Sequence, residues 1–199
     1  MPDADRLVGG GAPMLGERLP IELANTRYAV RGEPRDGLLT AEHLGAWLRD
    51  SRDRFRTPFG DGDLLAVTAA ELTVARQLRD ANHALLTAVV AGTPPPQRAV
   101  ATVNRVARSV PRWPQLRWGE LPTIESGTRG PPVAAALAEV ADATVDLFAG
   151  PHRDLIRSCL APGCVLFFLK DHPRRTWCSE GCGNRARVAR FHARHLAEG

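Results

Sequence analysis

A chain of 199 residues with 44% hydrophobic and 24% charged residues can bury a core, as one large domain or as a large and a small one. No window approaches 18 consecutive apolar residues, and the start lacks the basic segment and apolar core of a signal peptide. This excludes a membrane partner and predicts a cytoplasmic location. The net charge of +4 lies in residues 151–199, which hold nine of the 26 Lys and Arg but four of the 22 acidic residues. Such asymmetry indicates a polyanionic partner for one end of the chain.

Residues 15–150 are predicted to form a mostly helical α+β domain with a small β-sheet. Residues 19–30 are apolar with polar interruptions and fit either a strand or a short helix. The segment GEPRDG, residues 32–37, predicts a turn. Thr40 then predicts the N-cap of an amphipathic helix.

Apolar residues at three- and four-residue intervals follow Asp61 and predict one longer helix that stops at Gly92. Thr93 would cap the next helix. Residues 111–124 are rich in tryptophan and proline and predict one or two short strands. An apolar stripe over residues 133–148 predicts a last helix before a link into the cysteine-containing end of the chain.

All four cysteines lie near the C-terminal end, as Cys159-x4-Cys164 and Cys178-x3-Cys182. Two short cysteine pairs are typical of a tetrahedral zinc site, because each pair forms a turn that directs two sulfurs at one point. A four-cysteine site leaves no open coordination position, so the one Zn²⁺ per chain is expected to be structural. The alternatives, two disulfides or buried free thiols, are disfavoured in a cytoplasmic chain.

The surrounding residues predict a C-terminal treble-clef-like zinc finger over 155–199. VLFFL (165–169) and TWC (176–178) are strand-like, and DHPRR (171–175) is expected at the tip of a hairpin between them. A helix is expected to follow Cys182, with its N-terminus facing the thiolates.

That helix, residues 183–196, would present an arginine-rich face. Arg187, Arg190 and Arg194 share one side of it, and Val188, Phe191 and Leu196 are expected to pack on the zinc module from another. An arginine-rich helix on a rigid scaffold suits phosphate contact and entry into a DNA major groove. The predicted DNA-contacting residues are Arg174, Arg175, Arg185, Arg187, Arg190 and Arg194, of which Arg185 could instead brace the second cysteine pair.

The segment WCSEGCGNRARVARFHARH resembles the CGNR zinc-finger family, whose tetrad is present here as Cys182-Gly183-Asn184-Arg185. CLAPGC and the following Phe167-Phe168 are similar to the first half of that finger. Residues 15–26 (LGERLPIELANT) and 43–48 (HLGAWL) resemble the ABATE domain, an α/β domain that precedes this finger in proteins described as stress-induced transcription regulators. The resemblance implies four cysteine ligands and a role in transcription regulation.

Two other functions stay open at this stage. The N-terminal domain could sense a small-molecule effector or form a homodimer, with the finger as its output. Alternatively, the finger could be a protein-interaction module without specific DNA binding. No nucleophile–base arrangement indicates an enzyme, and Asn25 is interpreted as a turn or cap residue.

Overall fold

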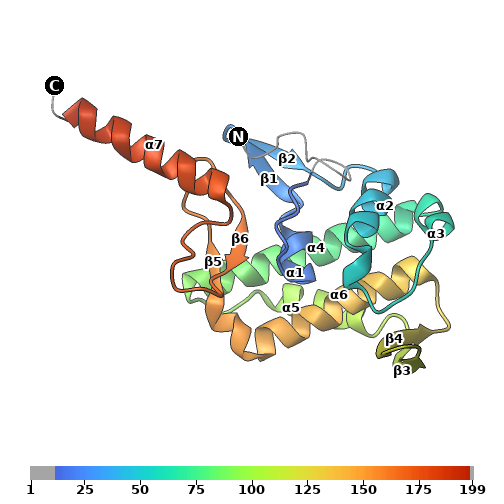
Figure 1. Cartoon of the computed structure of the whole chain (residues 1–199). Coiled ribbons are helices and arrows are strands. Elements are labelled where there is room, and N and C mark those ends of the chain that lie inside the picture. Colours follow the sequence, from blue (N-terminus) through green and yellow to red (C-terminus); the bar gives the residue numbers. More distant parts are fainter. Residues whose placement is uncertain (1–11, 198–199) are drawn as a thin grey trace.

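The structure is a computed structural model that describes residues 12–197, with side chains described up to residue 195 (Figure 1). Six helices form the body of the fold, and a seventh extends away from it. The helices are α1 (Leu19–Ala24), α2 (Ala41–Asp50), α3 (Asp61–Leu65), α4 (Ala69–Ala91), α5 (Gln97–Ala107), α6 (Pro132–Ala149) and α7 (Glu180–Ala197), with short 3-10 turns η1 (Arg52–Arg54) and η2 (Pro151–Leu155). Among these described helices, none is long and apolar enough to cross a membrane.

Side-chain caps define where the central helices begin and end. The Thr40 hydroxyl accepts from the His43 amide at the start of α2, as the sequence predicts. The prediction of a single helix from Asp61 to Gly92 is wrong, because the segment forms two helices, α3 and α4. Thr68 is the N-cap of α4: its hydroxyl accepts from the Glu71 amide, and its own amide donates to the Glu71 carboxylate. Gly92 ends α4 in the left-handed conformation, at φ 65°.

The three longest helices of the body, α4, α5 and α6, pack against α1 and α2 around one core. Trp47 of α2 is 1% exposed, and Leu78 of α4 and Val140 of α6 are fully buried beside it. The α+β prediction with a mostly helical N-terminal region is confirmed. Helix α5 begins at Gln97, with Pro96 as its N-cap, so the predicted cap at Thr93 is wrong.

The strands form separate antiparallel hairpins and no single sheet. β1 (Arg27–Val30) pairs with β2 (Glu33–Asp36), so most of the segment predicted as a turn at 32–37 is a strand. β3 (Arg112–Trp118) pairs with β4 (Pro122–Thr128), which confirms strands in the tryptophan-rich segment. This second hairpin leaves Leu116, Trp118 and Leu121 more than two-thirds exposed.

The third hairpin joins β5 (Ile156–Ser158) to β6 (Phe167–Leu169) and connects the cysteine region to the helical body. The hairpin predicted between the two cysteine pairs is therefore wrong, because β6 pairs with the strand that precedes the first pair, and residues 176–178 are not a strand. Successive side chains of β6 point to opposite faces. Phe167 and Leu169 pack with α1, α4 and α6, whereas Phe168 packs with the cysteines.

Asn25 joins the end of α1 to β6. Its backbone caps α1 as predicted, and its side chain donates to the Phe167 carbonyl and accepts from the Phe167 amide, both at 2.9 Å. Asn25 is fully buried. The amide side chain therefore replaces the neighbouring strand that β6 lacks on this edge.

Two buried glutamates extend this contact. Glu17 is 4% exposed; it accepts from the Leu169 amide at 3.0 Å and forms an ion pair with Arg175. Glu22 is 1% exposed and accepts from the Leu15 and Glu17 amides, which fixes the segment that carries Glu17. Burial raises the pKa of both carboxyl groups.

We expect Asn25→Ala to lower the free energy of unfolding by about 2–5 kcal/mol, because it leaves the amide and carbonyl of Phe167 buried without partners. Urea unfolding followed by circular dichroism measures this loss. Asn104→Ala on the exposed side of α5 is the matched control and should change stability little. Equal effects of the two substitutions would contradict the assigned role of Asn25.

His83 gives the contact between α4 and β6 a pH dependence. Its ring lies edge-on to Phe167, with centroids 5.2 Å apart, and burial, followed by the charge of Arg27, lowers its pKa. Below about pH 6.5 the unfolded chain takes up a proton that the folded chain resists, so the free energy of unfolding falls as pH falls.

We expect His83→Phe, which keeps a ring but cannot be protonated, to lose less stability than the wild type between about pH 7.5 and about pH 6. Urea unfolding at the two pH values checks this difference. His192→Phe, at an exposed position of α7, should behave as the wild type does. A wild type and a His83→Phe variant with the same pH dependence would count against the contact as the cause.

Candidate metal centre and basic helix

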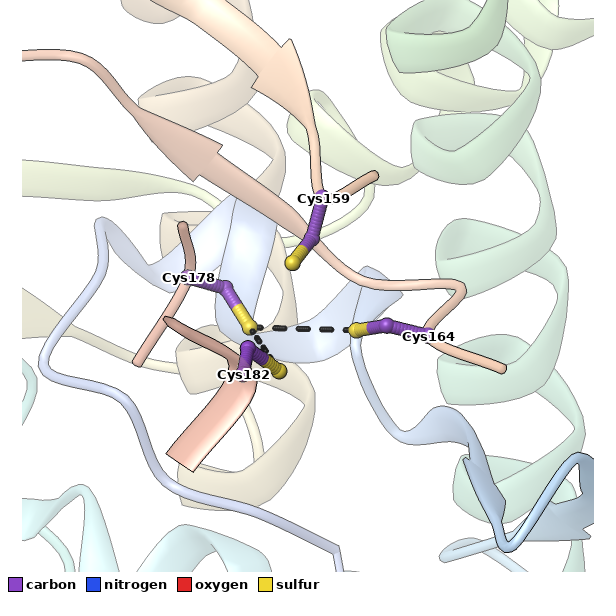
Figure 2. A group of neighbouring side chains, drawn as sticks. All are labelled: Cys159, Cys164, Cys178 and Cys182. Carbon is purple, nitrogen blue, oxygen red and sulfur yellow. Dashed lines mark hydrogen bonds between the residues drawn. The ribbon is translucent and has the colours of Figure 1, made fainter. Parts of the chain in front are cut away.

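The four cysteine thiols converge on one point (Figure 2). The point lies between the loop formed by residues 159–164, here called the first knuckle, and the start of α7. Their sulfur atoms all lie within 4.8 Å of one another. The Sγ atoms of Cys164 and Cys178 are 3.8 Å apart, and those of Cys178 and Cys182 are 3.3 Å apart. Three of the four residues, Cys159, Cys178 and Cys182, are buried.

The first knuckle is a tight loop closed by main-chain bonds. The Cys159 amide donates to the Leu166 carbonyl at 2.8 Å, and the Cys164 amide donates to Ala161 at 2.9 Å. Gly163 makes the turn at φ +71°. A Cβ atom there would also meet the backbone of Gly32 at 3.3 Å, so the knuckle lies directly against the β1–β2 turn.

The second knuckle, residues 178–182, includes the first turn of α7. The Ser179 hydroxyl accepts from the Cys182 amide at 3.3 Å, which is the bond of an N-cap residue to the third helical position. The Cys182 sulfur therefore lies at the positive end of the helix dipole, where negative charge is stabilised.

Apolar side chains from both halves of the chain enclose the thiols. Phe168 of β6 and the partly buried Trp177 come from the cysteine region, and Leu15 and Tyr28 come from the N-terminal region. The walls of the centre thus come from residues more than 130 positions apart in the sequence, and a pocket of about 600 Å³ beside Leu15 and Tyr28 reaches Cys164, Cys178 and Cys182.

The thiols shift one another's pKa values. Hydrogen bonding with Cys164 lowers the pKa of Cys159 to about 6, and hydrogen bonding with Cys159 lowers the pKa of Cys182. Hydrogen bonding with Cys159 raises the pKa of Cys164 and of Cys178. Four thiolates this close repel one another strongly, so full ionisation requires a cation between them.

The arrangement fits zinc. Sulfurs bound at about 2.3 Å in a tetrahedron lie about 3.8 Å apart, close to the separations seen between these cysteines. Four sulfur donors with no oxygen or nitrogen among them also favour zinc over magnesium or calcium.

Comparison with known families agrees with this geometry. The ABATE family model, described as "putative stress-induced transcription regulator", matches residues 17–151. The chain belongs to the ABATE family. A CGNR zinc-finger model matches residues 156–195, so the converging cysteines are the zinc-binding site of that finger. The search of curated proteins returned no match.

The geometry explains three of the four CGNR residues. Cys182 contributes a sulfur to the centre. Gly183 lies under the Trp177 ring, where a Cβ atom would meet the ring at 3.0 Å. Arg185 donates to the Cys182 sulfur at 3.0 Å, so it braces the knuckle in this structure. Asn184 is exposed, and nothing in the structure explains its presence.

The predicted DNA-contacting arginines of this ABATE protein divide into two groups. Arg174, Arg187, Arg190 and Arg194 are exposed, and so is Arg185, although it donates to the Cys182 sulfur. Arg175 lies over the Phe168 ring at 5.1 Å and is tied to Glu17 and to the Leu169 carbonyl. The basic face of α7 is therefore free for a partner, whereas Arg175 is engaged between the two halves of the chain.

The apolar side of α7 differs from expectation. Val188 and Phe191 were expected to pack on the zinc module, but each is 56% exposed, because α7 extends away from the body (Figure 1). The expected packing of Leu196 falls on a side chain outside those that the structure describes.

Sequence reasoning missed the part that Glu17, Glu22 and Asn25 play in holding the finger. The sequence marks them as polar, since two acids, an arginine and an amide lie in the largely apolar segment 17–25, but it does not reveal their partners. Buried polar groups of this kind need partners from elsewhere in the fold.

We expect one zinc per chain in the purified protein and near none in Cys182→Ser, by elemental analysis. Because Phe167 and Leu169 belong to a core shared with α1, α4 and α6, loss of zinc should also lower the urea midpoint of the whole chain. Leu160→Ser, in the exposed part of the first knuckle, is the control and should keep its zinc. A wild type without zinc would overturn the metal assignment.

Proposed function

We propose that this protein is a DNA-binding transcription regulator in which a structural zinc fixes the base of an arginine-rich helix. The observation that supports this most directly is the basic face of α7, whose arginines Arg187, Arg190 and Arg194 are exposed. The helix itself extends away from the helical body (Figure 1). The family description of a transcription regulator agrees with it.

The proposed zinc ligands are the four cysteine thiolates. All four donor positions of a tetrahedral site are then filled, which leaves no place for water or substrate. The metal acts by holding the two knuckles together, and so sets the direction in which α7 leaves the finger. The ligands are Cys159, Cys164, Cys178 and Cys182.

The principal DNA contacts are Arg187, Arg190 and Arg194. Their spacing places them on one side of α7 over about 10 Å, two turns of helix, a length that fits within a major groove. Arg174, on the exposed loop before the second knuckle, is a secondary phosphate contact. Arg175 and Arg185 are secondary as well, since Glu17 and Cys182 already bind them.

The choice of cation supports nucleic acid as the partner. Lys170 is the single lysine among the 26 basic residues, and the other 25 are arginine. The planar guanidinium group presents a fixed fork of donors that matches phosphate oxygens and the guanine edge, whereas an ammonium group is a compact charge on a flexible stem.

The exposed apolar pair on α7 favours a second candidate, a protein-interaction module. Val188 and Phe191 lie beside the arginine face, so an acidic protein with an apolar groove would match both. In either case residues 155–199 act as the output of the protein. Residues 15–150 then serve as a sensing or dimerising domain in a cytoplasmic, non-enzymatic regulator.

We expect the triple substitution of Arg187, Arg190 and Arg194 by alanine to abolish DNA binding and leave the zinc content unchanged. Binding by the wild type should weaken with salt, with a log–log slope of about −0.9 for each phosphate contacted. Fluorescence anisotropy with a labelled random duplex at several salt concentrations measures both effects.

The control carries an equal loss of charge on another helix. Substitution of Arg98 and Arg105 of α5 and of Arg108 at its C-cap by alanine should leave DNA affinity near that of the wild type. If both triple variants lose affinity equally, the binding is unspecific attraction to a basic protein. If the wild type shows no affinity at physiological salt, the protein-interaction module is the better assignment.

A further inference from the structure

A groove of about 570 Å³ lies between α4, α5 and α6. Apolar side chains form most of its walls, the larger of them being Leu85, Val89, Val100, Val103, Val145 and Phe148. A volume of this size and a predominantly apolar wall are typical of small-molecule sites.

The polar groups of the groove select an uncharged ligand. Arg153 and Asp154 are the charged residues of its lining, and they form an ion pair with each other at 3.3 Å. The Thr144 hydroxyl is already bonded to Asn82 and to the Val140 carbonyl. Two exposed polar side chains of the lining, Thr93 and Asn104, take part in none of the side-chain hydrogen bonds of the described part of the chain, and the amide of Asn104 can both donate and accept.

We propose that this groove binds an uncharged, largely apolar small molecule with one hydrogen-bonding group, a carbonyl, hydroxyl or amide, directed at Asn104. The apolar body of the ligand lies against Val100, Val145 and Phe148. The binding of a ligand to this groove does not depend on DNA. Only the consequence of binding, regulation of the finger's output, rests on the proposed function.

The groove is in direct contact with the residues that hold the finger. Val89 and Phe148 line it and also pack against the cluster that contains Phe167 and Leu169 of β6. Its rim includes residues of η2, which continues without a break into β5. A ligand that fills the groove therefore restrains Val89 and Phe148, and through them β6, whose other face carries Phe168 toward the cysteines.

N-Phenyl-1-naphthylamine is the probe for this site, because it is uncharged, apolar and carries one N–H group. Its fluorescence should rise with saturation on the zinc-loaded full-length protein. Val145→Trp, which fills the groove, should weaken binding at least about tenfold, as expected when a ligand loses its apolar contacts. Val90→Trp is the matched control, since Val90 is 41% exposed against 42% for Val145 but does not line the groove.

Hydrogen exchange tests the coupling. The saturating probe should slow exchange of the Phe167 and Leu169 amides several-fold and leave the β3–β4 hairpin amides unchanged as an internal reference. The proposal is overturned if the probe does not bind, if Val145→Trp binds it as Val90→Trp does, or if β6 exchange does not change on binding. None of these outcomes alters the arginine test of DNA binding, so the two proposals can fail separately.

Discussion

The pair of hydrogen bonds between the Asn25 side chain and the Phe167 main chain determines where the finger lies. A strand of three residues with one partner strand would be marginal alone. On the edge of β6 that faces away from β5, the Asn25 side chain bonds to the amide and carbonyl of Phe167. Two residues along the same edge, the Glu17 carboxylate accepts from the Leu169 amide. These bonds fix β6 to the end of α1, so that one face of the strand packs on the helical body and the other on the zinc centre.

This arrangement links metal binding to the helical core. Side chains alternate along β6, so that the core receives Phe167 and Leu169 and the cysteines receive Phe168. Energy supplied by zinc at one face therefore supports packing at the other. Helix α7 is joined to the centre through its first two turns, where Cys182 and Ala186 are buried, and the basic face beyond them stays exposed.

Features with local causes were predictable from the sequence. The cysteine pairs, the Thr40 cap and the stop at Gly92 depend on residues within a few positions of one another. The partner strand of β6 was not predictable from the sequence. Its pairing with β5 joins segments separated by the first knuckle, and hydrophobic periodicity carries no information on which strands pair. The break at Thr68 was missed because a capping threonine fits an apolar spacing as well.

The sequence marks Asn25 as a polar residue in a largely apolar segment, but it does not reveal the partner, for the same physical reason. A buried amide reveals its partner only when the fold brings distant segments together, here residues 142 positions apart. The ABATE-like motif includes Asn25 and its neighbours, but the contact with Phe167 exists only in the folded chain.

The shared face of the third hairpin limits how this finger could be exchanged between proteins. Many zinc modules can be moved as cassettes because their surfaces are complete without a host. Here Ile156, Phe167 and Leu169 would lie open to water on excision, and the Phe167 and Leu169 amides would lose their side-chain acceptors. Recombination that moved this finger without α1 would thus yield an aggregation-prone fragment.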